Sequence, residues 1–346
     1  MNNKIKMTFA AVTAAATLSV ASAQAEETLV INSFGGSYER THQELVIKPF
    51  EEKYGVKVKV VTAYSSDVLA QLRAQKDNPT FDVVHFSGGL DAIAAKEGLL
   101  APIKPEELSN YDQMYPFAVA NLAQGIGPMY KTAAIGLLYN TEALDKAPDS
   151  WSAIADDSVA DHVVLTDAAS NTYGLLAFLM LNKVNGGDVN NIKPGLDFVS
   201  GLLDRSMIVS KSPEIQQIFA QGNGWIAPYA QDYAYTLTKA GLPIAFTMPK
   251  EGAVAAPITV NLVKGSKHRD LALKFIDYSI RAEASKGWAE AMRYSPTNKT
   301  VVLDDDIAKQ VVYGEEQISK LITFDGHDIS EKRGEWTEAW KRTISR

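Results

Sequence analysis

The sequence predicts an α/β protein in which strands alternate with helices, in a chain long enough for two such domains. Short apolar runs at residues 28–34, 56–62 and 81–86 are each followed by a turn and a helix-like pattern, which is typical of a parallel sheet. Without an export leader, roughly 320 of the 346 residues remain, which suits two domains better than one. The chain has no cysteine, so its stability must come from a large apolar core rather than from disulfides.

The first 25 residues have the composition of a secretory leader. Lys4 and Lys6 precede an alanine-rich apolar run over 7–20, and small-x-small cleavage sites follow at 21–23 and 23–25. An apolar run of about 14 residues is short for a membrane-spanning helix. We therefore expect cleavage after this leader and export to a bacterial periplasm. Because there is no lipobox cysteine, no lipid anchor is expected.

Each strand of the first half ends in a short polar loop. The first strand runs into Gly35 and Gly36, which permit a sharp turn, and Ser37 is expected to cap the helix that follows over 38–54. The carboxyl ends of parallel strands meet at one edge of a sheet, where open α/β sheets bind ligands. The three loops expected to meet there are residues 35–38, 65–66 and 87–89.

The second half predicts another α/β domain, entered by a crossing strand over 134–140. Ser150 is expected to cap a short helix, and a strand follows at 163–166. The segment GWIAPYAQDYA, residues 224–234, reads as a strand, a polar-aromatic turn and the start of a helix. The tail from about residue 304 shows a helical, amphipathic pattern.

Tyr229 and Asp232 are the clearest candidate binding residues. They follow an apolar strand and lie among polar and aromatic side chains rather than inside an apolar run. The face of a tyrosine ring attracts a cation by about 0.5–2 kcal/mol, and a carboxylate pairs with it directly. The alternative is a purely structural role, in which Tyr229 belongs to the core and Asp232 caps a helix.

Composition argues against several classes of function. The net charge is −7 and no basic block exceeds two residues, so nucleic acid is not an expected partner. No two of the five histidines lie within four residues of each other, so no metal site is expected. No nucleophile elbow, P-loop or dinucleotide fingerprint stands in a suitable context. We therefore expect neither an enzyme nor a cofactor.

The order of these pieces resembles the periplasmic solute-binding proteins of ABC importers, in the branch that includes the spermidine/putrescine-binding proteins. The resemblance implies the type II periplasmic binding protein fold, in which two doubly wound α/β lobes joined by crossing hinge strands close on a solute. It further implies an inner-membrane permease as partner and a monomer. The matching pieces are FGGSYERTH, FDVVHFSGG, AIGLLYN, PDSWSAI, GWIAPYAQDYA, PKEGA and SKHRDLALKFIDYSI. The implied bounds are 1–25 for the leader, 26–134 plus 261–302 for lobe 1, and 135–260 plus 303–346 for lobe 2.

The resemblance also indicates which charges the site keeps. Tyr229 and Asp232 match the aromatic-x-x-Asp motif that holds an ammonium group in polyamine binders of this branch. A second acid of those binders falls on Ile258 here, and a third is replaced by the neutral residues 170–172. Neutral groups at a helix N-terminus suit a carboxylate. A γ-aminobutyrate-like amino acid or a short amine is therefore the predicted solute.

Ten residues from both halves of the chain are predicted ligand contacts. They are Gly36, Ser37, Tyr38, Ser87, Gly88, Ser170, Asn171, Thr172, Tyr229 and Asp232. One alternative is a true putrescine or spermidine receptor in which Asp67 or Asp91 replaces the missing acids. Another is a ferric ion carrier or an enzyme on the same scaffold. Ferric-binding relatives use adjacent tyrosines, which this segment lacks.

Overall fold

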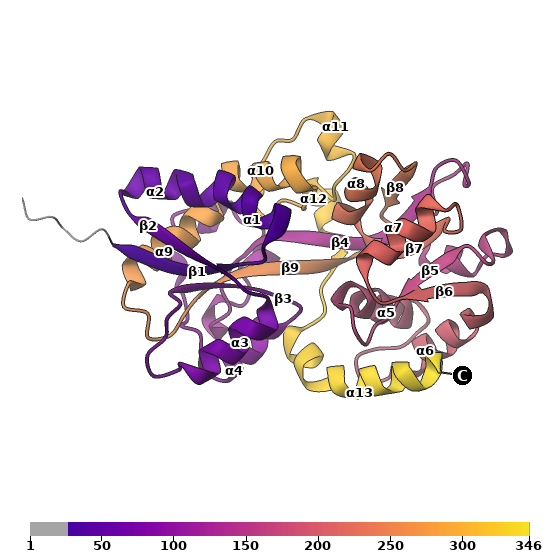
Figure 1. The fold of residues 1–346 in the computed structure, drawn as a ribbon, viewed down its shortest axis with the longest axis horizontal. Coiled ribbons are helices and arrows are strands. Elements are labelled where there is room, and N and C mark those ends of the chain that lie inside the picture. Colours follow the sequence, from indigo (N-terminus) through magenta and orange to yellow (C-terminus); the bar gives the residue numbers. More distant parts are fainter. Residues whose placement is uncertain (1–26, 346) are drawn as a thin grey trace, which may run out of the picture.

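The computed structural model describes residues 27–345, which form two lobes joined by two long strands (Figure 1). The predicted leader, residues 1–25, lies outside the described residues. Among residues 27–345, no helix combines the length and the apolar character that a membrane span requires.

One mixed sheet runs through both lobes in the order β2-β1-β3-β9-β4-β7-β5-β6, with β10 beside β9 and β8 beside β4. The outer strands of each lobe are parallel, as the alternation with helices predicted. The strands are β1 Thr28–Ser33, β2 Lys57–Thr62, β3 Val83–Ser87, β4 Met129–Asn140, β5 Val163–Thr166, β6 Ser206–Val209, β7 Ile226–Ala230, β8 Ile244–Thr247, β9 Ala253–Leu262 and β10 Leu321–Ile322.

β4 and β9 are the antiparallel pair that joins the lobes. The first part of β4 pairs with β9, and its second part pairs with β7 and β8. β9 in turn pairs with β3 of the first lobe. The predicted crossing strand is therefore confirmed, although it begins earlier, at Met129. The proposed lobe bounds at residues 134 and 260 remain a prediction.

Helices cover both faces of the sheet in each lobe (Figure 1). They are α1 Gly36–His42, α2 Lys48–Tyr54, α3 Ser65–Ala74, α4 Leu90–Lys96, α5 Thr172–Val184, α6 Lys193–Ser200, α7 Ser212–Ala220, α8 Gln231–Lys239, α9 Arg269–Ser279, α10 Ala282–Met292, α11 Asp305–Ala308, α12 Gly314–Ile318 and α13 Gly326–Ile344. A π-helical turn, Gln43–Ile47, joins α1 to α2 within the single helix that the sequence predicted.

Two capping predictions had different outcomes. The prediction that Ser37 caps the first helix was wrong, because α1 already begins at Gly36 and Ser37 lies exposed in its first turn. The turn depends on Gly35, whose φ of 76° favours glycine. The Ser150 prediction is confirmed, since its side chain accepts a hydrogen bond from the Ser152 N–H at the start of a 3₁₀ turn.

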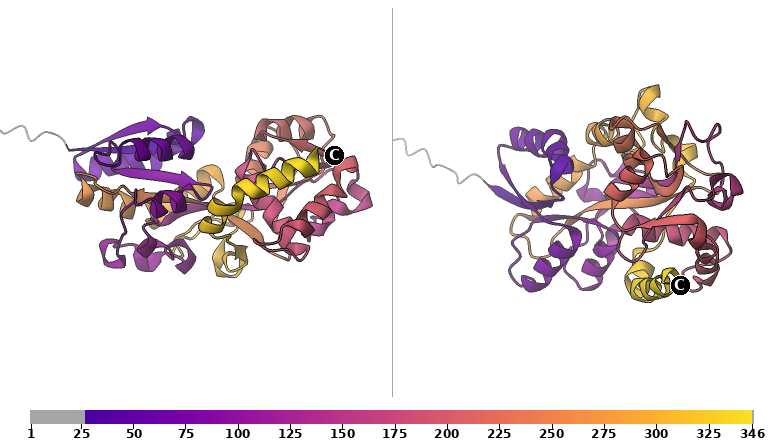
Figure 2. Two further views of the ribbon diagram at one scale, coloured as in Figure 1. Left: turned by 90° about the horizontal axis from the view of Figure 1, so that it is seen from below. Right: turned by 45° about the vertical axis from the view of Figure 1, so that its right-hand side comes forward.

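The C-terminal helix α13 spans the boundary between the lobes. It packs on α4 of the first lobe and on α6 of the second, and Figure 2 shows it running along one side of the molecule. Near its start, Glu331 pairs with Lys96 of α4 at 2.5 Å. Near its end, the ring of Trp340 packs edge-on against Phe178 of α5, with centroids 5.2 Å apart. One continuous helix therefore contacts both lobes.

Candidate ligand-binding site

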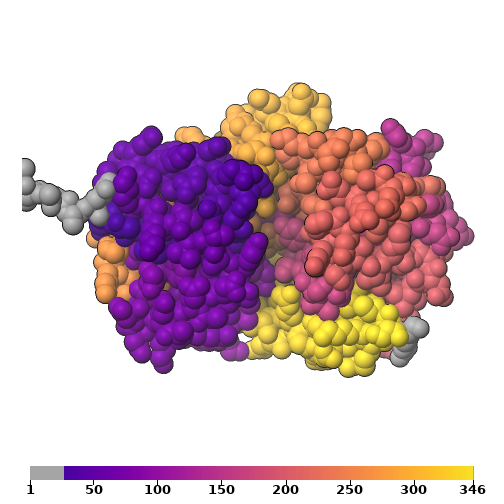
Figure 3. Space-filling view, in the orientation of Figure 1, coloured from indigo at the N-terminus to yellow at the C-terminus, as the bar shows by residue number. Residues whose placement is uncertain are grey.

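A cavity of about 1130 Å³ lies between the two lobes, where their strand-end loops face each other. The space-filling view shows a furrow between the indigo lobe and the coral lobe, with α13 in yellow below it (Figure 3). All three loops predicted to share one sheet edge contribute to the lining, and so do residues 170–173 of the second lobe. The chain therefore builds its main hollow at the place that the strand order predicted.

Most of the predicted contact residues line this cavity. They are Tyr38, Ser87, Gly88, Ser170, Asn171, Thr172 and Tyr229. Gly36 and Ser37 do not line it and are exposed on the first turn of α1. Asp232 is not a lining residue either; it lies in the first turn of α8, just beyond the end of β7 that carries Tyr229.

Asn171 and Tyr229 form a bonded polar wall on the second lobe. Asn171 caps α5, because its side-chain oxygen accepts the N–H groups of Tyr173 at 2.9 Å and Gly174 at 3.3 Å. The buried Tyr229 hydroxyl lies 2.6 Å from the Ser212 hydroxyl and accepts a bond from the Asn171 amide. These bonds fix the cap and the tyrosine relative to each other.

The two lobes touch at Gly88 and Thr172. Gly88 has a φ of 70°, and a Cβ built on it would lie 3.1 Å from the Thr172 hydroxyl oxygen and 3.9 Å from the Arg333 guanidinium. The loop between β3 and α4 thus sits directly against the start of α5. The two lobes therefore come close together at this part of the cavity.

Arg333 is a cavity residue that the sequence did not reveal. It projects from α13 into the lining, is half-buried, and has no hydrogen-bond or ion-pair partner among residues 27–345. Burial alone lowers the pKa of its guanidinium. In the sequence it falls on the polar part of an amphipathic helix, which normally faces solvent. Only the position of α13 across the lobes turns it toward the cavity.

Asp232 is a buried acid behind the tyrosines of the cavity wall. Its residue is partly accessible, but the Oδ1 oxygen is buried and has no hydrogen-bond partner within the described chain. Burial raises the pKa of this carboxyl to about 7, while its own N–H and the charge of Lys131 act in the opposite direction. After burial, the Asp232 charge is the largest cause of the raised pKa of Tyr173 and Tyr294, which line the cavity.

Lys131 is the second functional candidate that the sequence did not reveal. It lies on β4, is 0% exposed, and has an Nζ without a hydrogen-bond partner in the part of the chain described here. Four rings, which we call the aromatic cage, surround this nitrogen. Their centroids lie 2.7 Å from Nζ for Trp288, 3.8 Å for Tyr38, and 4.8 Å for both Tyr130 and Tyr294.

The description of a known family matches most of the chain. A family model described as bacterial extracellular solute-binding protein covers residues 46–313. The chain belongs to this family of solute-binding proteins. A family of this kind captures small molecules outside the cytoplasm, in agreement with a cavity enclosed between two lobes.

Individual relatives and structures agree with this assignment. The spermidine/putrescine-binding periplasmic protein of Escherichia coli K12 is 24% identical over 84% of this chain and 82% of its own length. The γ-aminobutyric acid-binding protein of Pseudomonas aeruginosa is 26% identical over 81% of this chain and 80% of its own. The crystal structure of an ABC transporter from Clostridium perfringens superposes with a TM-score of 0.81, at 23% identity, over 91% of this chain and 99% of that one. The likeness in structure confirms the two-lobed type II fold.

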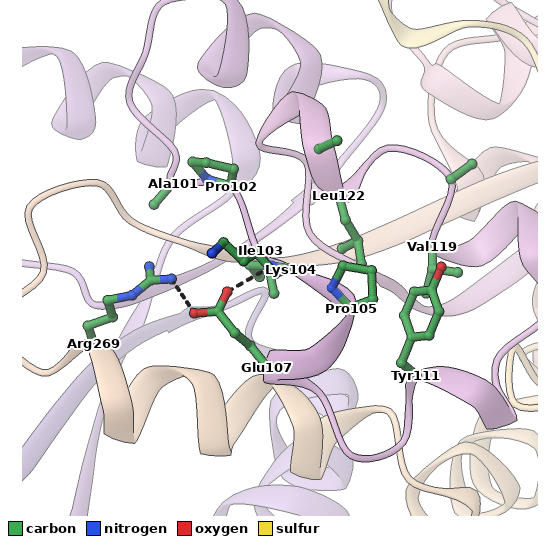
Figure 4. Close-up of a pocket in the computed structure, with 12 residues that line it drawn as sticks. Ala101, Pro102, Ile103, Lys104, Pro105, Glu107, Tyr111, Val119, Leu122 and Arg269 are labelled. Carbon is green, nitrogen blue, oxygen red and sulfur yellow. Dashed lines mark hydrogen bonds and ion pairs between the residues drawn. The ribbon is translucent and has the colours of Figure 1, made fainter.

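The solute-binding protein has a further hollow on its first lobe, shown in Figure 4. This depression of about 670 Å³ is bordered by residues 101–105 and by Arg269 of α9. Its carboxylate, Glu107, is already paired with the Arg269 guanidinium at 2.7 Å and accepts the Lys104 N–H at 2.8 Å. The cavity between the lobes is larger and is lined by residues of both lobes, so it is the candidate site.

Two acidic residues, Asp91 and Asp325, line the solute cavity. The oxygens of Asp91 accept hydrogen bonds from the Thr259 hydroxyl and the Ala92 N–H. Asp325 caps α13, because its side chain accepts the His327 N–H. Ile258 also lines it, at the position where the resemblance placed an acid in polyamine binders. Across residues 27–345, no group of three histidine or acidic side chains is arranged to hold a metal ion.

Proposed function

We propose that this solute-binding protein captures a small amine-containing solute, of which a γ-aminobutyrate-like amino acid fits best. The lobes close on the solute, and contacts made only in the closed form favour that form. The closed protein then delivers the solute to an inner-membrane ABC permease. The protein acts as a periplasmic monomer without a lipid anchor, performs no catalysis and binds no nucleic acid.

The observation that carries this choice of solute is the Arg333 guanidinium, which has no hydrogen-bond or ion-pair partner within residues 27–345. It lies beside Gly88 and near the Thr172 hydroxyl at one end of the cavity. A half-buried guanidinium without a counter-charge favours an anion, and its planar fork matches a carboxylate. A diamine would instead bring a like charge to this end.

The aromatic part of the cavity lining suits the amine. Tyr38, Tyr229 and Tyr294 belong to it, and the charge of the Asp232 carboxyl, whose Oδ1 has no hydrogen-bond partner within residues 27–345, acts on Tyr229 and Tyr294. Ring faces attract an ammonium group, and a carboxylate in the layer behind adds long-range attraction. Direct contact between Asp232 and the solute, as well as contacts by Gly36 and Ser37, requires side-chain or lobe movement and remains a proposal.

A polyamine receptor is the second candidate. The name of the Escherichia coli relative and the Asp91 carboxylate in the lining both favour it. Two lining residues count against it: Ile258 is apolar, and the Arg333 guanidinium, which has no ion-pair partner within residues 27–345, would repel an ammonium group. The ligand screen below decides between the two.

A thermal-shift screen tests the proposed function. γ-Aminobutyrate, putrescine, spermidine and ferric ion are compared, because a ligand that binds only the native state raises its stability by mass action. We expect γ-aminobutyrate to give the largest shift. Stabilisation by putrescine or spermidine alone supports the polyamine receptor, stabilisation by ferric ion alone supports a metal carrier, and a screen without any shift contradicts all three.

Arg333→Gln tests the carboxylate end directly. Loss of a charged hydrogen bond is worth about 1.5–3 kcal/mol, so we expect affinity for the amino acid to fall by a factor of roughly ten to a hundred. Arg342→Gln on the same helix is the matched control, since Arg342 is exposed and does not line the cavity. Equal affinities of the two variants would contradict the role of Arg333.

A further inference from the structure

The packing of β4 does not explain why residue 131 is a lysine. Its side chain is fully buried, and Nζ finds no hydrogen-bond acceptor within residues 27–345. An unbranched apolar side chain of similar length would fill the same space without the penalty of desolvating an amine. A lysine here therefore suggests a role for its charge or for the amine itself.

The aromatic cage has the chemistry of an ammonium-binding site. Several ring faces around one nitrogen attract an ammonium ion, and cages of this kind recognise alkylated ammonium ligands. Burial lowers the pKa of the Lys131 amine well below its usual value, and the nearby Asp232 charge acts in the opposite direction. The aromatic cage and the Asp232 carboxyl together have the composition of an ammonium-binding site, and the Lys131 side chain occupies this site.

The cage shares a wall with the solute cavity. Tyr38 and Tyr294 are members of both. In the strand ladders, Lys131 lies opposite Ile258, and Ile258 lies opposite Ser87. Residues opposite each other in a ladder point to the same face of the sheet, and Ile258 and Ser87 both line the cavity. Lys131 therefore leaves the sheet on the cavity side.

We propose that the side chain of Lys131 is a tethered amine that fills the aromatic cage and restricts the cavity to solutes carrying a single ammonium group. A solute ammonium cannot enter a cage that is already occupied, in whichever protonation state the lysine is. A second solute charge placed against Tyr38 or Tyr294 would also have to share Asp232 with Lys131. The inference deepens the proposed function and rests on it for the class of solute.

Emptying the cage tests its chemistry without any cavity ligand. Lys131→Ala removes the three terminal methylenes and the amine, a fragment that propylammonium replaces. We expect propylammonium to raise the unfolding midpoint of this variant in a saturable manner, and 1-propanol at the same concentration to have less effect. Lys183→Ala, an exposed lysine on α5, is the matched control and should show no such gain. If propylammonium shifts the unfolding midpoints of the two variants equally, the aromatic cage does not bind an ammonium group.

Putrescine binding tests selection by the filled cage. Lys131→Ala empties the cage, whereas Lys131→Met keeps the side-chain volume and leaves the cage filled. We expect the affinity of Lys131→Ala for putrescine to rise about tenfold or more over wild type, and that of Lys131→Met to stay within about threefold of wild type. The affinity of both variants for γ-aminobutyrate should change by less than about threefold. If putrescine binds Lys131→Ala no better than it binds wild type, Lys131 is not a filter. If wild type binds neither solute while propylammonium still stabilises Lys131→Ala, the proposed function fails and the cage stands.

Discussion

The side chain of Asn171 joins the start of α5 to Tyr229 at the end of β7. Its oxygen accepts the Tyr173 N–H at 2.9 Å, and its amide donates to the Tyr229 hydroxyl at 3.4 Å. One residue therefore caps a helix and positions a ring of the cavity wall. The two roles use different atoms, so they can be separated by substitution.

Asn171→Ala removes both roles. Loss of an N-cap typically lowers the free energy of unfolding by about 1 kcal/mol, and we expect a decrease of that size in chemical denaturation. Asn171→Asp keeps the capping oxygen and loses the amide donor, so its stability should be close to wild type while its affinity for solute falls. If the alanine variant is as stable as wild type, the cap contributes nothing.

Gly88→Ala tests contact between the lobes. Its added Cβ would lie 3.1 Å from the Thr172 hydroxyl, so the β3–α4 loop and α5 must move apart. We expect a larger radius of gyration in the presence of solute and at least about tenfold weaker binding.

Gly55→Ala is the control for backbone strain at Gly88. Gly55 has a similar φ of 66°, but its added Cβ meets nothing within 4 Å. Both variants should lose about 1 kcal/mol of stability from the positive φ, and only Gly88→Ala should open the cleft. Equal solute binding by the two variants would show that the contact is not needed for closure.

Asp232 predicts a pH dependence of stability. Its pKa is raised to about 7, above the value of about 3.9 in unfolded chains, so the folded state binds its proton more tightly. Its contribution is fully present below about pH 4 and is lost as the pH rises through about 7. Relative to Asp232→Asn, wild type should therefore lose up to about 4 kcal/mol between these values in urea denaturation. If the unfolding free energies of wild type and Asp232→Asn depend on pH in the same way, the pKa of Asp232 is not raised by burial.

His85 predicts the opposite slope. Burial lowers its pKa to about 3, so the folded state resists protonation that the unfolded chain accepts near pH 6.5. Its contribution is present above about pH 6.5 and is lost as the pH falls toward about 3. His85→Gln should therefore reduce the acid sensitivity of the unfolding free energy, and His327→Gln on α13 should not. If the unfolding free energy of His85→Gln falls at acid pH as steeply as that of wild type, His85 does not cause the acid sensitivity.

The sequence predicted the features that depend on local pattern. Alternating strands and helices, the crossing strand and the three loops at one sheet edge follow from periodicity and from glycine and serine positions, and the structure confirms them. The Ser37 cap failed because a helix start shifted by one residue moves the capping position, and pattern alone does not fix such a boundary.

Lys131 and Arg333 needed the tertiary structure. Lys131 left a weak signal, a charged residue between Tyr130 and the apolar run that begins at Ala133, but a lysine usually marks a solvent-facing position. Arg333 left no signal, because its neighbours read as an ordinary polar helix face. Both acquire their surroundings from segments far away in the chain, which periodicity does not reveal.

The helix α13 is synthesised after all the strands of the sheet, although it contributes a residue to the cavity. Gly326–Ile344 follows every strand of the sheet in sequence, yet it supplies Arg333 to the cavity and contacts both lobes. As the chain leaves the ribosome, all strands and the capped α5 emerge before this helix. A polypeptide ending ahead of Gly326 would hold the complete sheet and the aromatic cage without the guanidinium. In the proposed function, the carboxylate of the solute is therefore held by a helix that is synthesised after every strand of the sheet.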